Sequence, residues 1–293
     1  MNKLLTFAFI GGDRRQLRVI VRLALDGHQI RLFGLEESDL AEQDHLYTAD
    51  SVEAAVSGAD VVVLPLPYTA GEGTVNAPFS KEKIYISDVL RNMNDKQILF
   101  AGKVDEQLHA FAVLHHVHTV DYMGREELAI LNAIPTAEGA LEIAMQETPF
   151  TIHGSRCLVI GSGRIGKILA KDLKALGADT YVASRKYSDL AWSDAYGYHP
   201  LPMKELTERL GTFDLIFNTA PTLILDFKRL SKINDRCLII DLASRPGGVD
   251  FETAQKLGKK VIWALSLPGK VAPDSAGDII KNTIINILEE LGV

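Results

Sequence analysis

Short apolar runs alternate with segments of helical periodicity along the whole chain. In the first half, five runs rich in β-branched residues predict strands at residues 4–10, 29–33, 59–64, 84–86 and 98–100. Between the first two runs, the apolar positions of residues 15–26 recur at near-helical spacing and are followed by Gly27, a common residue just after a helix. This order predicts a β-α-β unit.

The same alternation restarts in the second half. Further strands are expected at residues 156–160, 180–183, 214–218, 238–241 and 260–263, with a helix over residues 165–176 that stops at Gly177. Parallel strands connected in this way need helices on both faces of the sheet. The sequence therefore predicts an α/β fold of two doubly wound, Rossmann-like parallel-sheet domains joined by linking helices.

The segment between the two halves has a helical pattern over residues 125–147 that is interrupted near Pro135. Thr148-Pro149 marks a boundary, because the residue before a proline leaves the helical region. We expect a first domain at residues 1–124, linking helices at 125–150 and a second domain at 151–275. The last helical segment, 276–293, either completes the second domain or crosses back to the first.

Composition narrows the class of protein. Hydrophobic residues make up 47% of the chain, charged residues 24%, and the net charge is −7, as in globular proteins. The absence of a dense basic block argues against nucleic acid or an anionic membrane as the main partner. The first apolar run is too short to cross a bilayer, and the two cysteines lie in apolar runs typical of buried strands. We expect a cytoplasmic protein without disulfides or a metal site.

A glycine-rich turn follows the first strand of the second half. Its residues are Gly161, Ser162, Gly163, Arg164, Ile165 and Gly166, and a helix comes directly after them. In this spacing the first glycine permits a tight turn, the second lets the backbone approach a pyrophosphate, and the third lets the helix pack on the strand. With a strand before it and a helix after it, the turn predicts a bound dinucleotide.

The end of the next strand indicates which dinucleotide. An NAD enzyme usually has an acidic residue there for the ribose hydroxyls, whereas this chain has Ser184, Arg185 and Lys186. A guanidinium can pair with a 2′-phosphate and a serine hydroxyl can donate to it. We therefore expect NADP; the alternative is a solvated basic loop.

Two further strands end in loops at the same predicted edge of the sheet. Thr219, Ala220 and Pro221 follow one strand, and Leu242, Ala243 and Ser244 follow the other. In an open parallel sheet this edge binds the ligand. These residues are candidate contacts to the ribose and nicotinamide, or ordinary turn residues that end strands.

The first half has a different turn at the corresponding place. Asp13 follows Gly11 and Gly12 where a phosphate turn would need another glycine, so we interpret it as the N-cap of the following helix. Arg14 and Arg15 then lie at the positive end of the helix dipole, a position that a nearby anion would stabilise. They are candidate substrate contacts. Alternatively, Arg14, Arg18 and Arg22 form one solvated helix face.

The histidines give weaker signals. Strand alternation would place His116 and His118 on one face, close to His115, but no further metal ligands accompany them. A solvated or partner-facing strand edge is the favoured interpretation. His153, just before the second sheet, either faces a ligand or is an ordinary loop residue.

Several motifs together resemble one bacterial family. They are Gly11-Gly12-Asp13 with Arg15-Gln16, Gly71-Glu72-Gly73, residues 134–139 (IPTAEG), residues 151–155 (TIHGS), residues 241–248 (DLASRPGG) and residues 267–273 (LPGKVAP). In these motifs the chain resembles the A subunits of bacterial dipicolinate synthases, over its whole length. The combination is more specific than the glycine turn alone.

The resemblance implies a function and site residues. It implies NADP-dependent oxidation of dihydrodipicolinate to dipicolinate during sporulation, in the mother-cell cytoplasm, beside a flavoprotein-like B subunit; a homo-oligomer is a further expectation. Candidate contacts to the dicarboxylate are Arg14, Arg15, Thr136 and Arg245, and candidate proton acceptors are Glu138 and His153. Alternatives are another two-domain NADP dehydrogenase of the alanine dehydrogenase or methylene-folate dehydrogenase type, and a non-catalytic NADP-sensing scaffold subunit.

Overall fold

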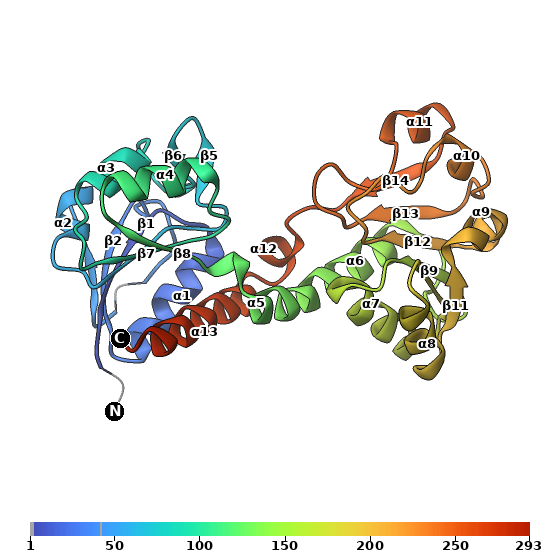
Figure 1. Cartoon of the computed structure of the whole chain (residues 1–293), viewed down its shortest axis with the longest axis horizontal. Coiled ribbons are helices and arrows are strands. Elements are labelled where there is room, and N and C mark those ends of the chain that lie inside the picture. The colour runs from blue at the N-terminus through green and yellow to red at the C-terminus, as the bar shows by residue number, and fades with distance from the viewer. Residues whose placement is uncertain (1–2, 42) are drawn as a thin grey trace. The chain divides into compact units, whose positions relative to one another are not determined.

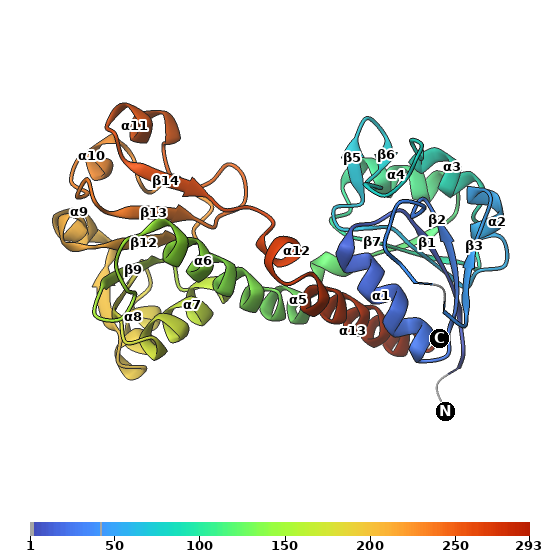
Figure 2. The ribbon, with the colours of Figure 1, turned by 180° about the vertical axis from the view of Figure 1, so that it is seen from behind.

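The computed structural model describes residues 3–41 and 43–293 (Figures 1 and 2). Two compact units are present: residues 1–131 with 272–293 form unit 1, and residues 132–271 form unit 2. The chain therefore passes from one unit to the other twice, and its C-terminal segment belongs to unit 1.

Unit 1 is built on a six-stranded parallel sheet in the order β3-β2-β1-β4-β7-β8. Its strands are β1 (Thr6–Ile10), β2 (Gln29–Phe33), β3 (Leu46–Thr48), β4 (Val61–Val63), β7 (Ile98–Ala101) and β8 (His118–Asp121). A small antiparallel hairpin of β5 (Thr69–Gly71) and β6 (Thr74–Val75) follows β4. The strand order reverses beside β1, so the switch point lies at its carboxyl end.

Helices cover both faces of this sheet because its strand residues alternate between two apolar cores. Phe7 and Phe9 point into one core, with α1 (Arg14–Leu25), α5 (Glu126–Leu131) and α13 (Pro273–Leu291), while Ala8 and Ile10 point into the other. The second core is closed by α2 (Val52–Val56), α3 (Ile86–Arg91) and α4 (Glu106–Leu114). Figures 1 and 2 both show α1 and α13 side by side under the sheet.

The contact between α1 and α13 explains why the C-terminal segment belongs to unit 1. Arg18 donates from Nε and Nη2 to the two carboxylate oxygens of Asp278, at 2.9 and 3.0 Å. Arg22 lies 3.6 Å from the same carboxylate. A side chain at Gly277 would meet the backbone of Arg15, so the two helices approach closely at this point. Arg18 and Arg22 thus pair with α13 while remaining partly exposed, and of the alternative solvated arginine face only Arg14 is fully exposed.

Unit 2 repeats the architecture with a sheet in the order β11-β10-β9-β12-β13-β14, all parallel. The strands are β9 (Arg156–Ile160), β10 (Asp179–Ser184), β11 (His199–Pro202), β12 (Leu215–Asn218), β13 (Leu238–Asp241) and β14 (Lys260–Trp263). One face packs on α6 (Ala133–Glu147), α7 (Arg164–Ala175) and α12 (Leu267–Val271). The other packs on α9 (Leu206–Arg209), α10 (Phe227–Leu230) and α11 (Phe251–Lys256), and α8 (Tyr187–Ala195) follows β10.

The expected fold class, two doubly wound Rossmann-like domains, is confirmed. The strand expected at residues 84–86 is wrong: Tyr85 makes an isolated bridge to Thr74, and α3 begins at Ile86. The pattern missed β3 and β11, which are edge strands with few apolar residues, whereas β8 is an edge strand that begins at the exposed His118, in agreement with the expected strand edge. His116 precedes β8 with a φ of +55°, so His116 and His118 do not share a strand face.

The apolar stretch 126–147 contains the helix interruption expected near Pro135. Helix α5 ends at Leu131, four residues before Pro135, because Pro135 has no N–H to donate to the carbonyl of Leu131. Residues 126–147 are also long and apolar enough to cross a membrane, with a mean hydropathy of 1.3. In the α6 part, however, Ala137, Ala140 and Ala144 are buried in the core of unit 2. Core packing therefore accounts for the small apolar residues at these positions of α6.

Candidate functional site

The glycine turn of unit 2 lies at the carboxyl end of β9, where the strand order reverses. Gly161 has a φ of +106°, and a side chain there would meet the Thr219 hydroxyl. A side chain at Gly166 would collide with the carbonyl oxygen of Gly161, so this glycine lets α7 pack against the turn. By contrast, nothing lies within 4 Å of a side chain built at Gly163. The first and third glycines are thus required by the protein's own packing, and the second leaves space for a ligand.

The start of helix α7 is suited to an anion. Gly163 is its N-cap and supplies no side-chain hydrogen bond, and the first turn contains no acidic residue. The first N–H groups of a helix have no partner within the helix, and the helix dipole makes this end positive. A pyrophosphate at Gly163 would meet these N–H groups directly. Gly161, Ser162, Gly163, Arg164, Ile165 and Gly166 therefore form a turn that fits a dinucleotide.

The matching turn of unit 1 is closed by its own side chains. Asp13 caps α1, as expected, and accepts a hydrogen bond from the backbone N–H of Arg15 at 2.9 Å. The Arg15 guanidinium donates to both Asp13 oxygens and to the carbonyl of Leu66. Only 11% of the Arg15 side chain is exposed. This side chain holds the turn together, and we correct its expected role as a free substrate contact; Arg14, by contrast, is exposed.

Two loops at the same edge of unit 2 are held by a buried pair. Asn218 and Asp241, the last residues of β12 and β13, have no exposed surface. Asn218 Nδ2 donates to Asp241 Oδ1 at 2.7 Å and to the carbonyl of Ala220 at 3.0 Å. Asp241 also accepts from the N–H groups of Ala243 and Gly248, at 3.1 and 2.8 Å.

This pair fixes the candidate cofactor contacts in the two loops, which are Thr219, Ala220, Pro221, Leu242, Ala243 and Ser244. Thr219 Oγ1 additionally donates to the carbonyl of Ile160, at the start of the glycine turn. Sequence reasoning named the loops and missed the role of Asn218 and Asp241. The available signal was a polar residue at the end of an otherwise apolar strand.

Arg245 lies in the loop after β13, exposed and above an aromatic ring. Its guanidinium carbon is 5.7 Å from the centroid of the Trp263 ring. Trp263 Nε1 donates to the carbonyl of Ala243 at 2.9 Å, and its ring stacks on Phe251 with centroids 4.8 Å apart. The stack orients a cation at the ligand edge of the sheet without neutralising it.

The basic segment after β10 differs in part from the expectation. Arg185 and Lys186 are exposed. Ser184 is buried, and its hydroxyl donates to Asp189 Oδ2 at 2.8 Å. The serine proton is therefore already used within the protein.

His153 lies away from the carboxyl ends of the strands. His153 precedes β9 at the amino edge of the sheet, where its Nδ1 lies 3.2 Å from the carbonyl of Leu176. A five-residue strand, roughly 16 Å long, separates that edge from the glycine turn. This position contradicts a catalytic role for His153 at the turn.

Glu138 and Thr136 both belong to α6. Glu138 lines a groove of about 660 Å³ between α6 and α7, in which Asp172 also lies. Burial and the nearby Glu138 charge raise the pKa of Asp172. The groove extends along α7 from Ile168 to the end of the helix, whereas the glycine turn precedes the helix at Arg164. The Thr136 hydroxyl donates back to the carbonyl of Asn132, so its proton is not free for a carboxylate.

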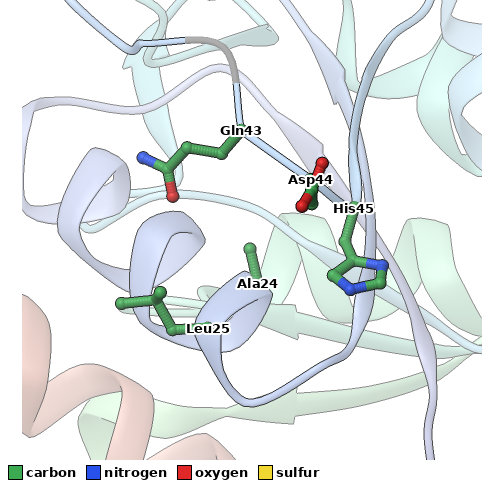
Figure 3. A pocket seen from close by; sticks show the side chains of 5 residues that line it. All are labelled: Ala24, Leu25, Gln43, Asp44 and His45. Carbon is green, nitrogen blue, oxygen red and sulfur yellow. The ribbon is translucent and has the colours of Figure 1, made fainter.

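A further hollow in unit 1, about 720 Å³ in volume, lies at the opposite edge from the Gly12 turn (Figure 3). Ala24 and Leu25 line it from the end of α1, and Gln43, Asp44 and His45 line it from the segment before β3. His45 Nδ1 is 2.8 Å from Gln29 Nε2 and so already has a partner. The hollow does not contribute to the candidate site.

Models of two protein families match the chain, one in each half. Residues 6–123 match the N-terminal domain of the dipicolinate synthase A subunit, and residues 134–253 match the NAD binding domain of D-isomer specific 2-hydroxyacid dehydrogenases. Together with the open glycine turn, the second match defines the class: a two-domain oxidoreductase with a nicotinamide-dinucleotide-binding domain.

Comparison with single relatives gives the family. The chain is 37% identical to the dipicolinate synthase A subunit of Bacillus subtilis (strain 168), over 98% of this chain and 97% of that protein. The crystal structure of the B. subtilis protein superposes with a TM-score of 0.91, covering 100% of this chain and 98% of that one. The crystal structure of the Bacillus halodurans counterpart gives 0.91 at 32% identity, covering 98% and 99%. The chain belongs to the family of dipicolinate synthase A subunits.

A more distant structure shares the fold alone. The transhydrogenase from Sinorhizobium meliloti superposes with a TM-score of 0.72 at 14% identity, covering 98% of this chain and 93% of that one. An identity this low carries no argument about substrate.

Proposed function

We propose that the protein oxidises dihydrodipicolinate to dipicolinate with NADP as the acceptor. The observation that carries this proposal is the 37% identity with the B. subtilis relative over nearly the whole of both chains. The open turn at Gly163 supports it, because it supplies a site for the cofactor in unit 2.

The reaction needs positioning more than acid–base chemistry. When bound, a nicotinamide cofactor would supply the acceptor for the hydride that leaves a ring carbon of the substrate. The substrate also loses a proton, and the product is an aromatic pyridine dicarboxylate. Since aromaticity favours the forward direction, the side chains must mainly orient the substrate and hold its two carboxylates. We assign the released proton to water rather than to Glu138 or His153.

Arg245 is the proposed carboxylate anchor of unit 2. Its guanidinium is exposed at the ligand edge of the sheet, and the Trp263 ring fixes its plane. A planar guanidinium can donate two parallel hydrogen bonds to one carboxylate. Arg14, exposed at the start of α1, is also proposed to contact a carboxylate.

NADP is proposed over NAD because of Arg185 and Lys186. Both follow β10, at the strand end where a Rossmann domain binds the adenosine ribose. Both are exposed cations, and a 2′-phosphate would pair with a guanidinium in this place.

A B-type partner is proposed from the name of the B. subtilis relative, which is called an A subunit. The resemblance adds that this partner is flavoprotein-like and that the complex acts in the mother-cell cytoplasm of a sporulating bacterium. The proposal also includes a homo-oligomer of the present chain.

The test is an assay with freshly generated dihydrodipicolinate and either NADP or NAD, with and without the B-type partner. We expect dipicolinate and NADPH to form in equal amounts, and faster with NADP than with NAD. No dipicolinate under any of the four conditions would overturn the proposed activity. NADP binding without turnover would favour a non-catalytic, cofactor-sensing role.

A further inference from the structure

Ser184 and Asp189 form a pair at the end of β10. The Ser184 side chain is the last of the strand and is only 6% exposed. Its hydroxyl donates to Asp189 Oδ2 at 2.8 Å. Asp189 is the third residue of α8, where a negative charge is also stabilised by the helix dipole.

The pair lies where a Rossmann domain recognises the adenosine ribose. This place is the end of the second strand, about 20 residues after the glycine turn. Strand β10 is that second strand, since it neighbours β9 and ends on the same edge as Gly161. The backbone N–H of Gly161 donates to the carbonyl of Ala183, one residue before Ser184, which ties the two segments together.

The direction of the hydrogen bond decides what Ser184 can offer a nucleotide. A serine hydroxyl has one proton and two lone pairs. Because the proton points to Asp189 and the backbone N–H of Lys186 donates to the same oxygen at 3.4 Å, only one lone pair is left for a ligand. It can accept a hydrogen bond from a 2′-hydroxyl, but it cannot donate one to a 2′-phosphate.

Charge acts in the same direction. Only the Ser184 side chain separates the Asp189 carboxylate from the expected position of the ribose. A carboxylate at this position repels a phosphate. Arg185 and Lys186, next in the chain, attract it. The two sides of this short segment therefore act on a 2′-phosphate in opposite directions.

We propose that Asp189 is a specificity-determining residue: through Ser184 it limits the preference of this nucleotide site for NADP over NAD. The inference rests on the proposed cofactor function of unit 2. It predicts a protein that binds both cofactors, with Arg185 favouring NADP and Asp189 reducing that preference.

Binding measurements on the full-length protein test the proposal. Dissociation constants for NADPH and NADH are measured by calorimetry for Asp189→Asn and Asp189→Ala. The asparagine removes the charge and can still accept from Ser184, whereas the alanine also frees the hydroxyl. We expect NADPH to bind roughly three- to tenfold tighter in Asp189→Asn, as for a partly exposed charge. It should bind tighter still in Asp189→Ala, with NADH changed less than about twofold.

Two matched variants separate the possible outcomes. Asp194→Asn makes the same charge change at an exposed residue near the other end of α8 and should leave both constants unchanged. Arg185→Ala should weaken NADPH by at least about tenfold and leave NADH unchanged.

If Arg185→Ala weakens NADPH while both Asp189 variants keep the wild-type ratio of the two constants, the role of Asp189 is refuted and the NADP proposal stands. If the Asp189 variants weaken the binding of NADPH and NADH equally, the Ser184–Asp189 pair only stabilises α8, which also refutes the inference. If neither Arg185→Ala nor the Asp189 variants change the ratio, the proposed NADP preference fails as well.

Discussion

Asn218 donates a 2.7 Å hydrogen bond to Asp241, and both side chains are completely buried at the carboxyl edge of unit 2. The two residues end neighbouring strands, so one contact fixes the relative position of two loops. A buried carboxylate persists only when its oxygens are satisfied, and here three donors converge on it. The pair is thus the framework on which the candidate cofactor loops are built.

Asp241→Asn should destabilise unit 2. The substitution replaces one carboxylate oxygen, an acceptor, with an NH2 group that faces another donor. We expect this to lower the free energy of unfolding by about 1–3 kcal/mol. Both tryptophans, Trp192 and Trp263, lie in unit 2, so their fluorescence in a urea titration reports this unit. Glu252→Gln, which removes an exposed helix pair, is the control and should leave the midpoint unchanged. An unaltered midpoint for Asp241→Asn would show that the network does not stabilise the unit.

In the glycine turn, a substitution at Gly163 should weaken cofactor binding without changing the stability of unit 2. Because space is open around Gly163 and its φ is −79°, Gly163→Ala should fold normally. The added methyl group should nevertheless block the pyrophosphate and weaken NADPH by at least about tenfold, or about 1.4 kcal/mol. The Trp fluorescence midpoint and NADPH calorimetry measure the two effects.

Gly166→Ala should behave in the opposite way. Its methyl group would collide with the carbonyl of Gly161, so unit 2 should lose about 1–3 kcal/mol of stability.

If Gly163→Ala still binds NADPH as tightly as the wild type, the cofactor does not bind at this turn.

Arg245 should affect the substrate more than the cofactor. If it holds a carboxylate, Arg245→Ala should raise KM for dihydrodipicolinate about tenfold or more, with the dissociation constant of NADPH unchanged. Arg245→Lys should recover only part of this, since lysine lacks the planar fork. Full activity in Arg245→Lys would contradict a two-point contact.

Trp263 provides an independent control for the same anchor. Trp263→Phe keeps an aromatic ring under Arg245 but loses the hydrogen bond to Ala243, whereas Trp263→Leu loses both. We expect KM to rise more in the leucine variant than in the phenylalanine variant. Equal KM values in the two variants would mean that the ring does not position Arg245.

The sequence predicted the central strands and the turn because both depend on local chemistry. Strands β2, β9 and β13 have the predicted bounds because their apolar residues face a core on one or both sides, and so does β14, an apolar strand at the edge of the sheet. Edge strands such as β11, with two prolines in four residues, have no such pattern. Residues 84–86 have the apolar composition of a strand. They form an isolated bridge and the start of a helix instead, and such segments also contain apolar residues.

Side-chain roles were harder to predict because they depend on partners far along the chain. Arg15 and Asp13 are neighbours, yet the carbonyl that completes their contact belongs to Leu66. Asp189 was not considered for the cofactor site, since only the folded helix α8 turns it toward Ser184. His153 is close to β9 in sequence but lies at its amino end, and a strand has only one end that faces the ligand.

The ion pair between α1 and α13 predicts a pH-dependent stability of unit 1. The Arg18 guanidinium, through its hydrogen bonds to Asp278, lowers the pKa of that carboxyl. A lowered pKa in the folded state means that the stabilisation is present above the pKa of an unfolded aspartate, about 3.9. It is lost as the pH falls through the folded-state pKa of Asp278. Both side chains are about one-third exposed, so solvent limits the effect to less than about 1 kcal/mol.

Asp278→Asn should therefore destabilise unit 1 at neutral pH, and its difference from wild type should shrink as the pH falls below about 3.9 and disappear only below the folded-state pKa of Asp278. Amide hydrogen exchange in α1 and α13 measures this unit, while Trp fluorescence should show an unchanged transition for unit 2. Asp274→Asn is the control, because its carboxylate is 76% exposed and 3.7 Å from Arg18. Should the two variants show the same exchange rates at neutral pH, the Arg18–Asp278 pair would not be what holds α13 to α1, and the apolar contacts would have to do so.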